Sequence, residues 1–221
     1  MAQTYTKNYN SNVFSDFISD LQSAYDWKNV EIAEDGSYAK FYVNETIIIV
    51  LWLTNSAIKF QIVDNGTVVT EQSTSGYFIT KTVKTNKAFC FTFMTSNSST
   101  NISPTGYLHY IIIGTAVNQL TGTEETALAY VYQYGTSSIS GYILSSDNLT
   151  EPVSTTNITS VSNNLGAKVT SMQNIFGKHS ECIMKDVYIL TSLQFTSFSF
   201  NDCTLNGKKY YMNSAILLAD N

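Results

Sequence analysis

From Asn29 onward the sequence is a succession of short segments rich in β-branched and aromatic residues, separated by turn residues. Such segments favour β-strands joined by tight connections. The clearest turn is Asn65-Gly66, which stands between "AIKFQIVD" and "TVVTEQ". Asn-Gly readily supplies the two positive φ angles of a two-residue hairpin loop. This pattern constrains the chain to a largely antiparallel β fold.

Individual segments add detail to this prediction. "SYAKFYVNE" alternates, with Tyr38, Lys40 and Tyr42 on one face, and "AIKFQIV" alternates in the same way. "TIIIVLWLT" is apolar on both faces, which is typical of a central strand. No internal repeat of fixed period is visible, which argues against propellers and β-helices. Further strands are predicted at "GYFITKTVK", "KAFCFTFMT", "GYLHYIIIGTA", "TALAYVYQYG" and "SGYILSS".

A helix is predicted before the strands, within residues 1–28, because "SNVFSDFISDLQSAYDW" carries apolar residues at three- and four-residue steps. Ser11 or Asn12 can cap its first turn. We expect the apolar stripe to pack on the rim or open face of the chain's own β-domain, and contact with a neighbouring subunit is the alternative. In that alternative the candidate interface residues are Phe14, Phe17, Ile18 and Leu21.

The predicted fold is therefore mainly β, with an antiparallel β-sandwich or barrel-like domain preceded by one N-terminal amphipathic α-helix. The β-domain spans 29–221. A long polar stretch at 145–166 is functional, disordered, or contains a strand that the pattern does not reveal. It is also the best candidate for a boundary that would split the β-domain.

Charged residues make up 13% of the chain, about half the usual share. Neutral polar groups and aromatic rings cost less to desolvate than charges, so this composition suits permanent protein contacts or sugar contacts. The net charge is −5 and the basic residues are scattered. Because nucleic-acid binding needs a concentrated basic footprint, this composition argues against a nucleic-acid partner.

The start "MAQTYTKNYNSNVF" lacks a basic stretch followed by an apolar one, so we expect no signal peptide. The most apolar run, "TIIIVLWL", is too short to span a bilayer, and we expect no membrane span. Cys90, Cys182 and Cys203 are an odd number of cysteines at unrelated spacings. They indicate reduced thiols in a protein made in a cytoplasm.

Motifs for nucleophilic catalysis and phosphate binding are missing from the sequence. It contains no G-x-S-x-G elbow and neither of the two glycine-rich phosphate loops. His109 lies inside "GYLHYIII", where a solvent-facing or satisfied core histidine is favoured over a general base. A Cys90–His109 pair stays an alternative without a supporting motif.

Metal binding and acid–base chemistry have equally weak signals. His179, Cys182 and Cys203 lack the C-x2-C spacing of structural zinc sites, and a fourth ligand is missing. Glu124 and Glu125 are adjacent, so in a strand their side chains point to opposite faces. We therefore predict no enzyme activity, no metal and no cofactor.

Tyrosines are frequent, with 15 in the chain, and "AYVYQYG" places Tyr130, Tyr132 and Tyr134 on one face of a strand. Cross-strand aromatic packing is the favoured interpretation. The alternative makes the three residues a surface that stacks on sugar rings or contacts a protein.

The closing stretch "LNGKKYYMNSAILLADN" contains a second turn of the same type, Asn206-Gly207. A two-residue hairpin loop there places Cys203 opposite Tyr210 and Phe198 opposite Ala215. We expect "SAILLA" to complete the core of the sheet.

The segment "DVYILTSLQFTSFSFNDCTLNGKKYYMNSAILLAD" is similar to closing segments of small tailed-bacteriophage proteins of the tail, baseplate or neck. The resemblance implies a virion structural protein, made in the host bacterial cytoplasm, that assembles as a homo-oligomer and with other virion proteins. One alternative is a carbohydrate- or receptor-binding β module on a phage tail or bacterial surface. Another is a polysaccharide-cleaving hydrolase, which would need two convergent carboxylates.

Overall fold

The computed structural model describes residues 3–8, 11–25, 29–54, 57–75, 77–96, 107–134, 138–144, 151–162, 169–177, 182–190, 201–205, 207–212 and 216–220. The described chain is mostly antiparallel β-structure with an N-terminal helix, which confirms the predicted fold class. In chain order the elements are β1 (Gln3–Asn8), α1 (Ser11–Ala24), β2 (Val30–Ile32), β3 (Tyr38–Tyr42), β4 (Ile47–Thr54), β5 (Ala57–Asp64), β6 (Thr67–Ser75), β7 (Tyr77–Lys84), β8 (Ala88–Ser96), β9 (Tyr107–Asn118), β10 (Glu124–Tyr134), β11 (Ser138–Leu144), β12 (Glu151–Ser162), β13 (Val169–Gly177), β14 (Cys182–Leu190), β15 (Asn201–Leu205), β16 (Lys208–Met212) and β17 (Ile216–Ala219).

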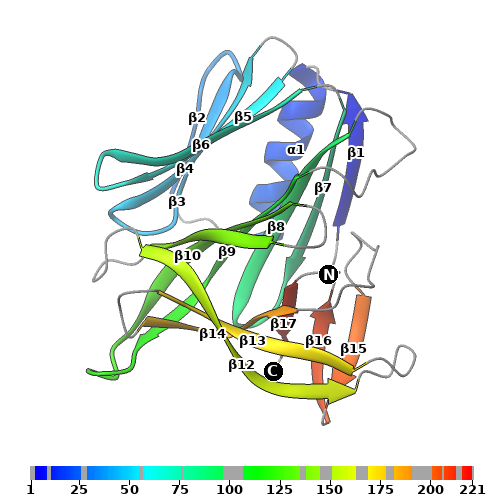
Figure 1. The fold of residues 1–221 in the computed structure, drawn as a ribbon. Helices are drawn as coiled ribbons and strands as arrows, with labels where there is room; N and C mark the ends of the chain where they lie inside the picture. Colours follow the sequence, from blue (N-terminus) through cyan, green and yellow to red (C-terminus); the bar gives the residue numbers. More distant parts are fainter. Residues whose placement is uncertain are drawn as a thin grey trace.

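The strands form two sheets (Figure 1). The smaller sheet has five strands in the order β2-β3-β4-β5-β6. The larger sheet has 12 strands and becomes barrel-like where β14 also pairs with β9. Strand β9 allows this because one of its edges pairs with β8 as far as Gly114 and with β14 from Ala116 onward.

The first core lies between the five-stranded sheet, helix α1 and one face of β8–β10. Figure 1 shows α1 between the five-stranded sheet and strands β1 and β7. The predicted helical stripe faces this core, and Phe14, Phe17, Ile18 and Leu21 are only 1 to 3% exposed. The expected packing on the chain's own β-domain is therefore confirmed. These four side chains are not exposed for contact with a neighbouring subunit.

The second core lies on the opposite face of β8–β10, against β14 and β17. Cys90, Ile112 and Ala129 contribute from the middle strands, and Met184 and Leu218 contribute from the later ones. Strands β8–β10 are thus covered on both faces, which explains the uninterrupted apolar run in β9. Residues before and after the stretch 145–166, such as Ala129 and Met184, lie in this one core.

The hairpin predicted at Asn65-Gly66 is confirmed. Asp64 pairs with Thr67, and the two residues between them have φ angles of 47° and 77°. Strand β4, predicted as central, is the middle strand of its sheet, and β3 alternates in burial as predicted.

Five strands differ from the predicted pattern. Strands β1, β2 and β13 were not predicted, and β12 lies inside the polar stretch 145–166, which agrees with the alternative that this stretch contains a strand. The sequence of β12, "EPVSTTNITSVS", is so rich in Ser and Thr that no apolar alternation reveals it. The closing run forms a separate strand, β17, which turns back so that Tyr210 lies opposite Ala219.

The closing hairpin otherwise agrees with expectation. Cys203 lies opposite Tyr210, which confirms the predicted register, while Phe198 and Ala215 lie outside the described residues. All four residues of β17 are buried, so this segment completes the second core as expected.

Helix α1, in the described part of the chain, is not long and apolar enough to cross a membrane.

Candidate functional site

The strongest candidate site is the outward face of the five-stranded sheet, which we call the outer face. Alternation in β3 buries Ala39 and Phe41 in the first core and turns Tyr38, Lys40 and Tyr42 outward. Directly opposed residues of antiparallel strands share a face, so the register defines the remaining members. With β3, the outer face includes Glu31 of β2, Ile48, Val50 and Trp52 of β4, Lys59 and Gln61 of β5, and Glu71 of β6.

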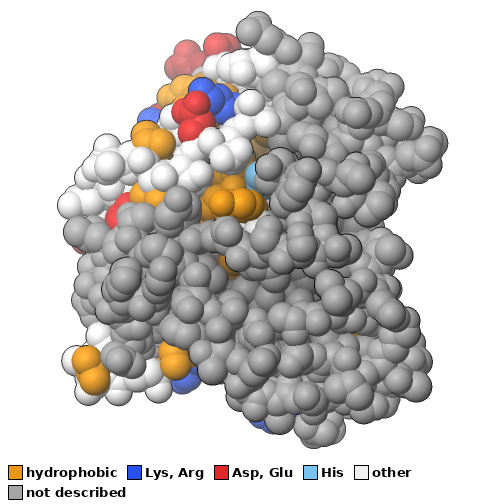
Figure 2. Space-filling view, in the orientation of Figure 1, with side chains coloured by type: hydrophobic (Ala, Val, Ile, Leu, Met, Phe, Trp, Pro, Cys, Tyr) orange, Lys and Arg blue, Asp and Glu red, His pale blue; other side chains and the backbone are white. Residues whose placement is uncertain are grey.

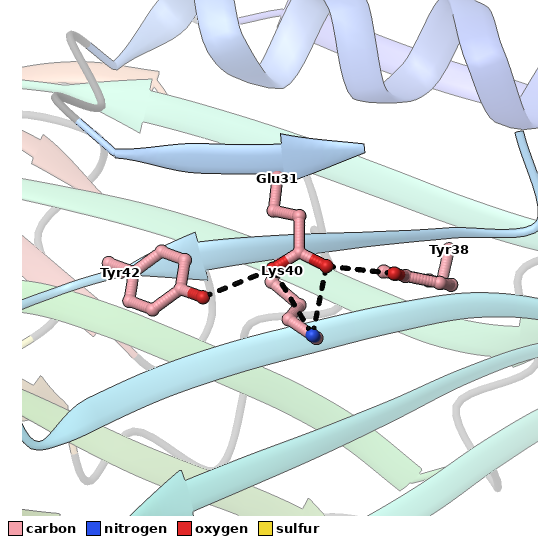
Figure 3. A network of polar contacts seen from close by, with 4 residues as sticks. All are labelled: Glu31, Tyr38, Lys40 and Tyr42. Carbon is pink, nitrogen blue, oxygen red and sulfur yellow. Dashed lines mark hydrogen bonds and ion pairs between the residues drawn. The ribbon is translucent and has the colours of Figure 1, made fainter. Parts of the chain in front are cut away.

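Glu31 organises one side of the outer face (Figure 3). Its Oε1 accepts hydrogen bonds from Tyr38 Oη at 2.8 Å and from Lys40 Nζ at 3.0 Å. Its Oε2 accepts from Lys40 Nζ at 3.2 Å and from Tyr42 Oη at 3.2 Å. One carboxylate of β2 therefore fixes three successive outward side chains of β3.

These contacts also set the ionisation of the network. Hydrogen bonds from Tyr38 and then from Lys40 lower the pKa of Glu31, and the bond to Glu31 raises the pKa of Lys40. The same carboxylate raises the pKa of Tyr38. All these groups lie at the solvent boundary, where ion pairs add little stability. Their main effect is to hold the two tyrosine rings in place.

A second network occupies the other side of the outer face. Lys59 Nζ lies 2.5 Å from Glu71 Oε1, and Gln61 also donates a hydrogen bond to Glu71. These two contacts, that of Lys59 first, lower the pKa of Glu71. Lys59 Nζ lies 5.9 Å from the ring centroid of Trp52, which itself lies opposite Tyr38. Each charge on this side is therefore already paired.

The outer face is suited to binding through rings and hydrogen bonds. Its aromatic side chains Tyr38, Tyr42 and Trp52 are all partly exposed. In Figure 2, acidic and basic side chains lie side by side at the upper left, over the five-stranded sheet, with hydrophobic side chains next to them. Pre-paired charges cost less to cover than isolated ones, and aromatic rings supply contact area without losing much conformational freedom.

The same geometry is unfavourable for glycoside hydrolysis on this face. Glu31 and Glu71 lie on the two edge strands of the five-stranded sheet, so four inter-strand spacings separate them by about 19 Å. Glycosidase carboxylates lie about 5 to 9.5 Å apart. In addition, both carboxyl groups have lowered pKa values, which is unsuitable for a general acid.

Two members of the predicted tyrosine stripe of β10, Tyr130 and Tyr132, point inward. Tyr130 is 1% exposed in the first core, and its ring centroid lies 5.6 Å from that of Phe60. Tyr132 packs against the same core, with its ring 5.9 Å from Tyr130. The favoured aromatic packing is thus confirmed for both residues, and Tyr130 is not available to stack on a sugar. The side chain of Tyr134 lies outside the described residues.

His109 is a satisfied core histidine. It is 7% exposed, and its Nδ1 lies 2.9 Å from Tyr130 Oη in a hydrogen bond. Burial lowers the pKa of His109 to about 4. The side chain is therefore neutral at physiological pH, as one of the two favoured interpretations predicted.

The Cys90–His109 pair is contradicted. His109 lies opposite Phe93, three residues from Cys90 along β8, so the two side chains project from opposite faces of the sheet. Cys90 belongs to the second core, and burial raises the pKa of its thiol far above the usual range. A thiol in that environment is a poor nucleophile.

The other candidate residues are the possible metal ligands and the adjacent carboxylates Glu124 and Glu125. Among the described residues, no cluster of three or more His, Cys, Asp or Glu side chains is arranged to hold a metal ion. The side chains of His179, Cys182 and Cys203 lie outside the described residues. Glu124 forms an ion pair with Lys185 of β14, while Glu125 projects from the other face of β10.

Local sequence pattern indicates only part of the outer face. Alternation placed Tyr38, Lys40 and Tyr42 together, but their partner Glu31 comes from a three-residue strand that no local pattern reveals. Trp52 joins them only through the register of β3 with β4.

The chain matches no protein-family model, no curated protein and no solved structure.

Proposed function

We propose that the protein is a non-catalytic structural component of a tailed-phage virion that acts by assembly with copies of itself and with other virion proteins. The outer face is the observation that supports this function best. Two of its three partly exposed rings, Tyr38 and Tyr42, are held by Glu31, and its charges are paired before any partner arrives. Aromatic residues are enriched at protein interfaces, and uncompensated charges are depleted there.

The composition and the closing segment support the same proposal. Only 13% of the residues are charged, which leaves a surface that is inexpensive to bury permanently. The segment from Asp186 to Asp220 resembles the ends of tail, baseplate or neck proteins. In this function the virion is the protein's final location, reached after synthesis in the host cytoplasm.

Assembly through the outer face is tested by light scattering coupled to size-exclusion chromatography over a wide concentration range. We expect a concentration-dependent oligomer that Tyr42→Ala and Trp52→Ala shift at least about tenfold towards monomer, since an aromatic interface anchor contributes about 2 kcal/mol. Leu120→Ala is the matched control, because Leu120 is 81% exposed on the distant β9–β10 hairpin. A parent protein that stays monomeric at high concentration and has no affinity for virion components would contradict the proposal.

A carbohydrate-binding β module is the second candidate function, and one observation favours it. Tyr38, Tyr42 and Trp52 present partly exposed rings beside hydrogen-bonding groups on a single sheet face. Sugars are bound by such rings together with polar groups that recognise hydroxyls. In this function the sugar would stack on the rings of the outer face and not on the β10 tyrosine stripe, because Tyr130 is buried.

A glycan array distinguishes the two functions. For the carbohydrate module, we expect binding of one or more glycans that Tyr42→Ala weakens and Leu120→Ala leaves unchanged. Circular dichroism melts of both variants establish that each remains folded. No glycan bound by the parent protein would remove this second candidate.

A further inference from the structure

Strand β6 forms a long edge of the five-stranded sheet. It has nine residues, and within the described chain it pairs with β5 alone. No other backbone hydrogen bond among the described residues reaches it. The other strands that end a sheet, β1, β2 and β15, have six, three and five residues. The N–H and C=O groups along such an edge can pair with an added strand.

The sequence of β6 lacks the residues that usually protect an edge. "TVVTEQSTS" contains no proline, lysine or arginine, and its one charged residue, Glu71, is paired with Lys59 of β5. The bulge between β5 and β6 lies on the turn side of Thr70, so Thr70–Ser75 pair with β5 in unbroken register. Val68, near the start of the strand, is 50% exposed. Strand β6 therefore presents a regular, almost uncharged stretch to a partner.

A second copy of the same strand fits this edge. A two-fold axis perpendicular to the sheet sets β6 antiparallel to the partner's β6, and antiparallel pairing is the more stable kind. Directly opposed residues then share a face, so the outer faces of the two copies become continuous. Because an outward side chain must lie opposite an outward one, every allowed register sets one residue of β6 opposite its own counterpart.

The position of Glu71 selects one of these registers. With Glu71 on the axis, two like charges would lie opposite each other, which is destabilising. With Gln72 on the axis, Glu71 lies opposite the partner's Ser73. Lys59 lies opposite Ser73 within one chain, so only this small side chain separates Lys59 from the partner's Glu71. The two strand spacings between them, about 10 Å, are within the reach of two long side chains.

The residue on the axis is also suited to pair with itself. Gln72 is exposed, and its amide group can both donate to and accept from the partner's Gln72. Thr70 then lies opposite the partner's Thr74, and opposed threonines stabilise a strand pair. The contact is therefore complementary in charge and in hydrogen bonding.

We propose that two copies of this chain pair through β6 with Gln72 on the two-fold axis, which joins two five-stranded sheets into one of ten strands. This inference rests on the proposed assembly of identical copies, and it uses the edge of the sheet instead of the rings of the outer face. The paired stretch is short, which is typical of a weak, reversible dimer. An added strand of unrelated sequence would not set Gln72 opposite itself.

Cysteine crosslinking of the full chain tests both the edge and the register. Gln72→Cys sets two thiols opposite each other at a Cα separation of about 4.5 to 5.5 Å, which allows a disulfide. Under mild oxidation we expect it to crosslink at least about tenfold faster than the parent chain, whose own thiols give the background. Thr67→Cys is the matched control, because residue 67 is exposed on the same strand but lies about 30 Å from its counterpart in this register.

A charge variant tests the same contact without oxidation. Gln72→Lys sets two lysines opposite each other and should weaken the dimer about fivefold in sedimentation velocity. Thr67→Lys adds the same charge to β6 away from the axis and should leave the dimer unchanged. Both residues are exposed, and thermal melts establish that each variant is folded. Equal weakening by the two variants would reduce the effect to net charge and overturn the assignment.

The outcomes separate this inference from the proposed function. Equal crosslinking in Gln72→Cys and Thr67→Cys, or none above the parent chain, would overturn pairing through β6. If Tyr42→Ala still lowered the mass of the oligomer in that case, assembly through the outer face would stand without it. Gln72→Cys should still crosslink when Tyr42→Ala is added, because the two surfaces are separate. Crosslinking that Tyr42→Ala abolishes would assign the contact to the outer face instead.

Discussion

His109 and Tyr130 lie in neighbouring strands, and their hydrogen-bonded side chains sit in the first core where two sheets meet. Their rings stack with an interplanar angle of 6°, and Phe60 of the other sheet contacts both. A histidine in such a place is neutral, because burial opposes the charged form. His109 is therefore a structural residue of the first core and not a general base.

The titration of His109 predicts a pH dependence of stability. Its pKa is about 4 in the folded chain and about 6.5 in the unfolded chain, so the unfolded state takes up the proton first. The free energy of unfolding is therefore expected to fall by about 3 kcal/mol as the pH decreases from 6.5 to 4. Urea denaturation at several pH values measures this loss.

The control for this prediction is His109→Gln, which keeps a hydrogen-bonding side chain but cannot titrate in this range. Its stability should change less steeply between pH 6.5 and 4 than that of the parent chain. An identical slope in the two proteins would contradict the assignment of the pH dependence to His109.

At the level of elements, the turn of the β5–β6 hairpin is determined by local sequence. Asn65 and Gly66 adopt positive φ angles, and Asp64 then lies opposite Thr67. The turn sets the register of the two pairs next to it, and a one-residue shift between Ile62 and Val63 changes the pairing of the rest of β5 with β6. Ile58, Phe60 and Ile62 alternate along β5 and are buried in the first core.

Gly66→Ala tests this local control. A Cβ at Gly66 would meet no atom within 4 Å, so its cost comes only from the φ angle of 77°. We expect a loss of about 1 kcal/mol in the free energy of unfolding, measured by urea denaturation. Asn65→Gly is the control and should be almost neutral, since glycine also accepts that conformation. A neutral Gly66→Ala would show that the turn relaxes at no cost.

At the scale of the whole molecule, two cores share the middle strands β8–β10. The first core holds the helix and the five-stranded sheet, and the second holds the C-terminal strands. Strand β17 pairs with β16 on one side and with β14 on the other, and all four of its residues are buried. The end of the described chain is therefore part of the tertiary structure.

Deletion of residues 214–221 tests this role. Four buried apolar residues at roughly 1.5 to 3 kcal/mol for each large side chain amount to a large part of the stability of a domain. We expect the truncated chain to be insoluble or to lose its cooperative thermal transition in circular dichroism. Deletion of 220–221 alone keeps β17 and should remain folded. A soluble truncation that melts cooperatively would contradict the prediction.

Local pattern predicted the fold class, the amphipathic helix, both Asn-Gly turns and the alternation that turns Tyr38, Lys40 and Tyr42 to one face. These features depend on neighbouring residues, whose spacing the sequence displays directly. Strand β12 was hidden because its Ser and Thr residues produce no apolar alternation. The tyrosines of β10 were placed on one face correctly, but alternation does not reveal which element covers that face.

The sequence by itself determined that this chain is antiparallel β with one packed helix, because turn residues and hydrophobic period act over a few residues. Only the tertiary structure decided that Tyr130 is buried while Tyr38, Tyr42 and Trp52 are partly exposed. It also brought Glu31 to β3 and left β6 at the edge of its sheet. The reason is that burial and long-range pairing depend on which strands become neighbours, and that choice is made by the whole chain.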